Sequence, residues 1–80
     1  MNKDIKLKID EILLKKLKIK KKLDNDTNLV SSGILDSFNL LHLILELEKN
    51  FEFVINLKKF NIKNFDTKKK IVSFVKKNIN

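Results

Sequence analysis

Hydrophobic residues recur along the first part of the chain with the period of a helix. From residue 5 the aliphatic side chains are spaced i, i+4, i+7, i+8 and i+12, which places them on one helical face: Ile5, Ile9, Ile12, Leu13 and Leu17. A strand-like alternation over residues 5–9 also exists, but it fails at Asp10-Glu11 and again at Leu13-Leu14. The pattern therefore predicts a first helix over about Lys3–Lys18.

A polar stretch then interrupts the pattern. From Leu23 to Asp36 the chain is rich in Asp, Asn, Thr, Ser and Gly, whose side chains bond the backbone locally and compete with regular helix. We expect a long loop here. Four apolar residues within it are expected to pin the loop to the core: Leu29, Val30, Ile34 and Leu35.

Two further helices are indicated after this loop. The second begins at Asp36-Ser37, both good N-terminal residues, and runs to about Asn50. Asp66-Thr67 caps a last helix that ends at about Lys77. Its buried stripe is expected at Ile71, Val72, Phe74 and Val75, with solvent around Lys68, Lys69, Lys70, Lys76 and Lys77.

The segment between these helices has a mixed pattern. Phe51 and residues 53–55 suit a short extended or turn segment, and Leu57–Ile62 suits one or two helical turns. The second helix is apolar nearly all round, so either most of its sides are buried or it keeps an exposed apolar face for binding. A stripe of Leu43, Leu47 and Phe51 is the candidate for the core.

Length and composition exclude several classes of function. The 80 residues form a single all-α domain over 1–80, too small to enclose a deep active site, so we expect no enzyme. The chain has no cysteine and only one histidine, His42, so we expect no metal site. No apolar run is long enough for a membrane span, which favours a soluble, cytoplasmic protein. We also expect a monomer.

The net charge of +8 is unevenly distributed. Residues 23–48 contain five acidic residues and no lysine, whereas lysines crowd both ends of the chain. A helical module that binds nucleic acid or an anionic membrane is thus an alternative function, although the absence of Arg, Tyr and Trp argues against specific recognition of nucleic acid. The cluster in question could equally be a solvated face: Lys15, Lys16, Lys18, Lys20, Lys21 and Lys22.

Ser37 has two interpretations. A hydroxyl at the first residue of a helix lies where backbone N–H groups are unpaired and where the helix dipole favours negative charge. A phosphate attached there would be stabilised as phosphates are at helix N-termini generally. Ser37, or Asp36 beside it, could also be an ordinary helix cap.

The string Gly33-Ile34-Leu35-Asp36-Ser37-Phe38 resembles the phosphopantetheine attachment motif of acyl and peptidyl carrier proteins. The resemblance continues through Leu47-Glu48 and Phe51 to Phe65-Asp66-Thr67, nearly the whole chain. It implies a four-helix bundle of the acyl carrier type with a long first loop and a short third helix. It also implies that a phosphopantetheinyl transferase attaches 4'-phosphopantetheine from coenzyme A to Ser37, making a phosphoprotein whose terminal thiol holds the cargo as a thioester.

The resemblance further implies partners and a docking face. A ligase would load an acyl or aminoacyl group, and a downstream acyltransferase or synthase would use it, as in fatty acid biosynthesis. Docking would involve the second helix at Asp36, Phe38, Leu41, His42, Leu45 and Glu48. From the residues alone, Phe38, Leu41 and Leu45 suit core packing equally well.

Small departures from the fatty acid carriers point to a different branch of the family. His42 and Lys49 stand where those carriers often have acids, so docking is not expected to rest on a line of carboxylates alone. Asp36, Glu46 and Glu48 are the acids nearest Ser37. The Asp36-Ser37-Phe38 form is more similar to D-alanyl and other aminoacyl carrier proteins of cell-envelope or secondary pathways.

Overall fold

The computed structural model describes residues 2–19 and 24–79. Its elements are α1 (Asn2–Glu11), a π-helical extension η1 (Ile12–Lys16), α2 (Ser37–Phe51), a 3-10 helix η2 (Ile62–Phe65) and α3 (Lys68–Asn78). Every regular element in the described ranges is helical, so the all-α prediction is confirmed. The expected loop start at Leu23 and the lysines at 20–22 lie outside the described residues.

The first helix changes its winding at Ile12, where α1 passes into η1. The Leu17 N–H donates to the Ile12 carbonyl at 3.0 Å, five residues back, as in a π-helix. This wider turn keeps Ile12, Leu13 and Leu17 all buried. The element ends at Lys16, and Leu17 is its C-cap. Lys18 follows with a left-handed φ of 56°, and the Ile19 N–H donates to the Leu13 carbonyl at 3.1 Å. The predicted helix thus ends near Lys16.

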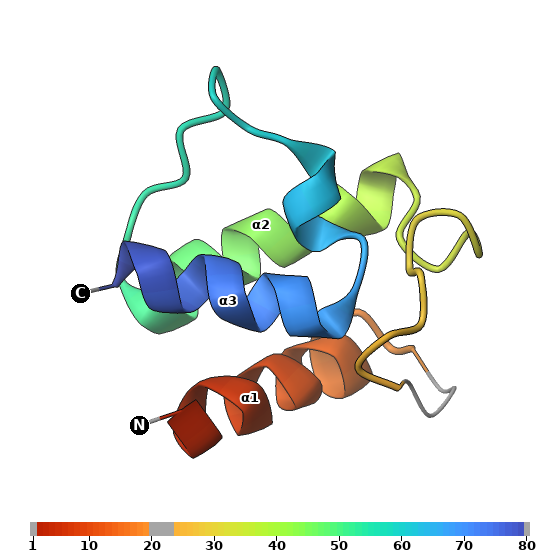
Figure 1. Ribbon diagram of the computed structural model, residues 1–80, viewed down its shortest axis with the longest axis horizontal. Coiled ribbons are helices and arrows are strands. Elements are labelled where there is room, and N and C mark those ends of the chain that lie inside the picture. Colours follow the sequence, from red (N-terminus) through yellow and green to blue (C-terminus); the bar gives the residue numbers. More distant parts are fainter. Residues whose placement is uncertain (1, 20–23, 80) are drawn as a thin grey trace.

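The three α-helices enclose one apolar core (Figure 1). α1 packs along α3, and η1 contacts α2. The predicted stripes supply most of the core, although Phe51, Val72 and Phe74 are only half-buried. Side chains with no exposed surface come from α1, α2, η2, α3 and the loop before α2: Ile9, Leu29, Leu43, Leu47, Phe65, Ile71 and Val75.

The loop over residues 24–36 is anchored as expected. Leu29 and Leu35 are buried, and the Leu35 N–H donates to the Leu29 carbonyl at 2.8 Å. Two backbone bonds fasten the loop to the start of the last helix, from Leu29 N–H to the Asp66 carbonyl at 2.7 Å and from Lys69 N–H to the Asn25 carbonyl at 3.1 Å. The loop therefore holds a defined path up to the beginning of α2.

The prediction for the third helix was wrong in position and type. Residues 57–58 form a turn, and the short helix is the 3-10 element η2 at Ile62–Phe65. The described residues thus contain three α-helices and a 3-10 helix in place of four α-helices. Phe60 and Phe65 explain the later position, because their rings contact each other at a tilt, with centroids 5.1 Å apart, and bring the chain back to the core just where η2 forms.

Lys68 was also wrongly expected in solvent. It is only 9% exposed, and its Nζ lies 2.7 Å from Asp10 Oδ1 on α1. An ammonium can be buried when a carboxylate partners it. This ion pair joins the start of α3 to α1, a contact that the local pattern of α3 could not reveal.

Candidate functional site at the start of α2

Asp36 forms the N-cap of α2. Its backbone is extended, with φ −80° and ψ −178°, and its side chain accepts the Asn39 N–H at 2.8 Å. Its carbonyl accepts the Leu40 N–H, also at 2.8 Å, and so begins the helical ladder. The capping function that the sequence left open between Asp36 and Ser37 therefore belongs to Asp36.

Ser37 is left free by this arrangement. It is the first residue of α2, and its side chain is exposed. Within residues 24–79 no group is hydrogen-bonded to its hydroxyl. The N–H groups of Ser37 and Phe38 belong to the first helical turn, where no intrahelical acceptor exists, and the positive end of the helix dipole lies there. A phosphodiester on this hydroxyl would therefore meet backbone donors and a favourable field.

Asn39 fixes the approach to Ser37, and the sequence analysis did not single it out. Its Nδ2 donates to the Ile34 carbonyl at 3.0 Å and so ties the end of the loop to the first turn of α2. The usable signal was an amide side chain three residues after an Asp cap, where side chains can reach back over the helix start. Gly33, with φ +83°, supplies the left-handed turn just before this link.

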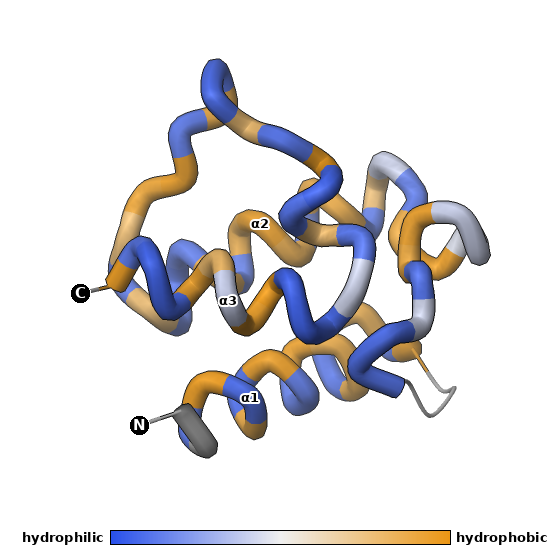
Figure 2. The backbone as a smooth tube through the Cα atoms, viewed as in Figure 1, coloured by the Kyte–Doolittle hydropathy of each residue, from blue (hydrophilic) through white to orange (hydrophobic). Residues whose placement is uncertain are grey.

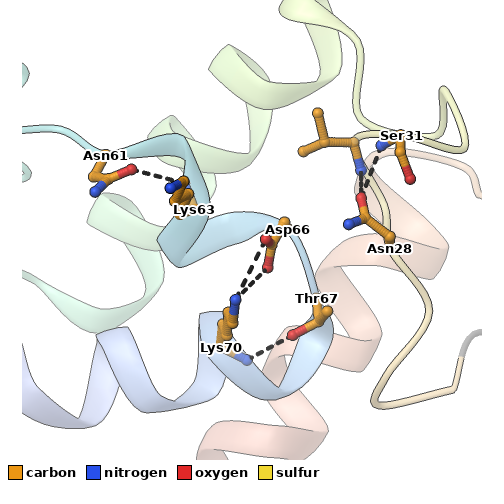
Figure 3. Close-up of polar contacts among 8 residues, drawn as sticks. Asn28, Ser31, Asn61, Lys63, Asp66, Thr67 and Lys70 are labelled. Atoms are coloured by element: carbon orange, nitrogen blue, oxygen red, sulfur yellow. Dashed lines mark hydrogen bonds and ion pairs between the residues drawn. The ribbon is translucent and has the colours of Figure 1, made fainter.

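The loop before Ser37 is supported from the start of α3 (Figure 3). On the loop side, Asn28 Oδ1 accepts the N–H groups of Val30 and Ser31 at 3.1 and 2.8 Å. On the helix side, Thr67 caps α3 by accepting the Lys70 N–H at 3.2 Å, while Lys70 Nζ lies 3.2 Å from Asp66 Oδ1. Because Leu29 bonds the Asp66 backbone, α3 and the loop hold each other in place.

One face of α2 presents apolar side chains to solvent. Phe38 is 77% exposed, Leu41 52% and Leu45 55%, whereas Leu43 and Leu47 on the opposite face have no exposed surface. Phe38, Leu41 and Leu45 are thus not core residues, which decides between the two interpretations of this stripe. It begins beside Ser37 and follows α2 away from it. Exposed apolar area next to a candidate attachment site is typical of an interaction surface.

The charged residues expected in docking are placed differently. Asp36 is exposed beside Ser37. His42 Nε2 lies 3.6 Å from Glu46 Oε2, one turn further along α2, and Glu46 also accepts the Asn50 side chain. Glu48 is half-buried, and its Oε2 accepts the Ile55 N–H at 2.8 Å. Glu48 therefore stabilises the chain after α2 and is not gathered with the residues near Ser37.

A free hydroxyl beside unpaired backbone donors and an apolar face can present a covalently attached phosphate-linked group. These are features that a carrier domain needs, since a carrier domain acts through a covalently attached arm. The family described as "Phosphopantetheine attachment site" matches residues 8–74. The chain belongs to this family of non-catalytic carriers, and the cofactor of the family is phosphopantetheine.

Comparison with curated proteins identifies relatives that are named D-alanyl carrier proteins. The chain is 36% identical to the one from Streptococcus suis over 50 residues, covering 62% of this chain and 63% of the relative. It is 39% identical to that of Streptococcus uberis over 51 residues, with 64% and 65% covered. For Lactobacillus delbrueckii subsp. bulgaricus the identity is 35% over 52 residues, with 65% of each chain covered. The chain thus spans somewhat less than two thirds of the length of these relatives.

The family assignment favours carrier function over the alternative of a basic helical module that binds nucleic acid or an anionic membrane. Of the lysine cluster invoked for that module, Lys15, Lys16 and Lys18 are exposed, and the others lie in the stretch that is not described. Across residues 2–19 and 24–79, no helix is both long and apolar enough to cross a bilayer.

Proposed function

We propose that Ser37 is the residue that bears 4'-phosphopantetheine, received from coenzyme A through a phosphopantetheinyl transferase. The observation that supports this most directly is that Asp36, and not Ser37, forms the N-cap of α2. Asp36 caps α2 and leaves the exposed Ser37 hydroxyl free of hydrogen bonds within the described chain. Attachment would then cost no existing side-chain bond at the cap, and the backbone N–H groups of the first turn would stabilise the phosphodiester.

Intact-mass spectrometry tests this assignment. Incubation of the apo chain with coenzyme A and a promiscuous transferase should add one phosphopantetheinyl group. Ser37→Ala should abolish the addition, while Ser73→Ala should leave it intact, because Ser73 is a comparably exposed serine on α3. Addition to Ser37→Ala, or no addition to the wild-type chain with an active transferase, would refute the assignment.

We further propose that the cargo is an amino acid, D-alanine, held as a thioester on the arm. The support is the set of relatives named D-alanyl carrier proteins, together with the Asp36-Ser37-Phe38 string. Cargo identity is a property of the loading enzyme, which must recognise the exposed surface around Ser37. The carrier would then act as a monomer in the cytoplasm, raising the effective concentration of its cargo at the partner enzymes.

A competition between loading enzymes tests the cargo. The holo protein is offered to a D-alanine-activating ligase with ATP and D-alanine, and separately to a fatty acyl ligase with ATP and a fatty acid. Loading by the first and not by the second, read as the mass of the thioester and removed by hydroxylamine, supports the D-alanyl assignment. Preferential fatty acyl loading would assign the chain to the fatty acid carriers while leaving Ser37 as the attachment site.

We propose that these partners dock on the exposed face of α2, at Asp36, Phe38, Leu41, His42 and Leu45. Leu41→Asp places a charge on this face, and we expect slower loading with an unchanged fold, because the side chain is half exposed already. Leu7→Asp is the matched control, since Leu7 is 65% exposed and lies on α1. Equal loading rates for both variants would remove Leu41 from the docking face.

A further inference from the structure

The segment over residues 53–63 has an unusual combination of exposed side chains. It projects from the end of α2 and returns at η2, away from the three α-helices (Figure 1). Val54 is 86% exposed and Leu57 63%, although both are large aliphatic residues. Lys58, Lys59 and Lys63 are exposed alongside them. No acidic residue occurs from Phe53 to Phe65, so the charged side chains of the segment are all basic. Hydrophobic and hydrophilic positions are interspersed along it (Figure 2).

This exposure is built into the fold. Ile55 is 5% exposed, and its N–H donates to Glu48 Oε2 at 2.8 Å, so the residue before it is directed outward. Phe53 packs on Phe74 with ring centroids 6.3 Å apart, and Phe60 packs on Phe65 at 5.1 Å. The core therefore holds the segment at both ends while Val54 and Leu57 are kept out of it.

The turn at the tip is also ordered by local bonds. Asn56 Oδ1 accepts the Lys58 N–H at 3.0 Å, and the Asn56 carbonyl accepts the Lys59 N–H at 3.1 Å. These bonds close the turn between Val54 and the two lysines. A turn that is already ordered loses less conformational entropy on binding than a flexible turn does.

We propose that the 53–63 segment is a docking surface for an anionic lipid bilayer. Lysines near such a surface are attracted by its negative potential, and aliphatic side chains next to them enter the boundary between headgroups and acyl chains. The cations of the segment are all lysines, and lysine is depleted in the cores of protein interfaces. A nucleic acid backbone would use the lysines but not Val54 and Leu57.

The inferred binding is weak and reversible. Each lysine near the surface contributes about fivefold to partitioning, and half-burial of two aliphatic side chains adds about one to two orders of magnitude. The carrier would therefore be enriched at the membrane without being anchored to it. This inference does not depend on Ser37, which lies at the other end of α2 from the point where the segment begins.

The test uses the full chain and vesicle co-sedimentation. One set of vesicles is phosphatidylcholine alone, and the other is phosphatidylcholine and phosphatidylglycerol in equal parts. Binding is expected only to the second set and should weaken as salt is raised. Lys58→Gln with Lys59→Gln should reduce partitioning about 25-fold. Val54→Ser with Leu57→Ser should reduce it about tenfold or more.

Matched variants on α1 separate a local surface from general attraction to a basic protein. Lys15→Gln with Lys16→Gln removes the same charge from exposed positions, and Leu7→Ser with Leu14→Ser removes comparable exposed aliphatic area. Both are expected to reduce binding by less than threefold. Equal losses for the two lysine pairs would overturn the proposal in favour of net charge.

A spectroscopic variant locates the contact. The chain has no tryptophan, so Val54→Trp introduces a single reporter. Its emission should shift to the blue with anionic vesicles, whereas Leu7→Trp should not shift. No vesicle binding, with the segment variants instead slowing loading by a partner enzyme, would overturn the proposal and assign the segment to protein docking. Ser37→Ala should bind vesicles like the wild type, so failure here is distinguishable from failure of the carrier assignment.

Discussion

Asp36 combines two roles that a pair of substitutions can separate. Its side chain accepts the Asn39 N–H at 2.8 Å, and its charge lies at the positive end of α2 next to Ser37. Asp36→Ala removes both the cap and the charge. Asp36→Asn keeps an oxygen that can accept the same N–H and removes only the charge.

The structure sets the expected magnitudes. Loss of an N-cap bond costs about 1 kcal/mol, and loss of a negative charge near an exposed helix N-terminus costs about 0.5 kcal/mol. We expect Asp36→Ala to lower the free energy of unfolding by about 1.5 kcal/mol and Asp36→Asn by about 0.5 kcal/mol. In a domain of this size these changes correspond to decreases in Tm of about 9 °C and about 3 °C.

Urea and thermal unfolding followed by far-UV circular dichroism measure these differences, because the chain lacks Trp and Tyr and is largely helical. The rate of phosphopantetheine attachment is measured on the same variants at a temperature where all are folded. If the charge contributes to docking, Asp36→Asn should slow attachment although it is nearly as stable as the wild type. Equal destabilisation by the two substitutions would refute the capping argument, and an unchanged attachment rate would remove Asp36 from the docking face.

Three further substitutions test the support of the site. Glu48→Ala should cost about 1–2 kcal/mol and raise hydrogen exchange at the Ile55 amide, which loses its acceptor, whereas Glu48→Gln should restore protection. Leu47→Ala empties a fully buried position and should cost about 2–5 kcal/mol in urea unfolding, while the same change at exposed Leu45 should stay within about 0.5 kcal/mol. Gly33→Ala should cost about 1 kcal/mol through backbone strain alone, because φ is +83° and no atom lies within 4 Å of the added Cβ.

The sequence predicted those features of the fold that depend on residue type and spacing within one element. The start of α2 at Ser37, the buried stripe through Leu43 and Leu47 and the Thr67 cap of α3 all follow from residue type and spacing within one element. The loop anchors Leu29 and Leu35 were also identified correctly. Each of these features depends on neighbours a few residues away, which a sequence displays directly.

The features that were missed depend on contacts between distant segments. Lys68 is buried because Asp10, on another helix, lies 2.7 Å away. The Glu48 carboxylate is hydrogen-bonded because the chain after α2 turns back and the Ile55 N–H donates to it. The residue types from Leu57 onward suggested a short helix there. The contact between the Phe60 and Phe65 rings instead brings the chain to the core at Ile62–Phe65, where the short helix forms. The spacing of hydrophobic residues within one element does not indicate which residue from a distant segment will contact it.

These contacts change the expected character of the docking face. Among the acids near Ser37, Glu48 accepts the Ile55 N–H, and Glu46 lies beside His42 and accepts the Asn50 side chain. Asp36 is then the exposed carboxylate next to a stripe of three exposed apolar side chains. We therefore expect each partner enzyme to bind the apolar stripe of this carrier in an apolar groove of its own. A single cation on the partner would pair with Asp36. Loading rates should accordingly depend only weakly on salt, since contacts between apolar side chains are not screened by ions.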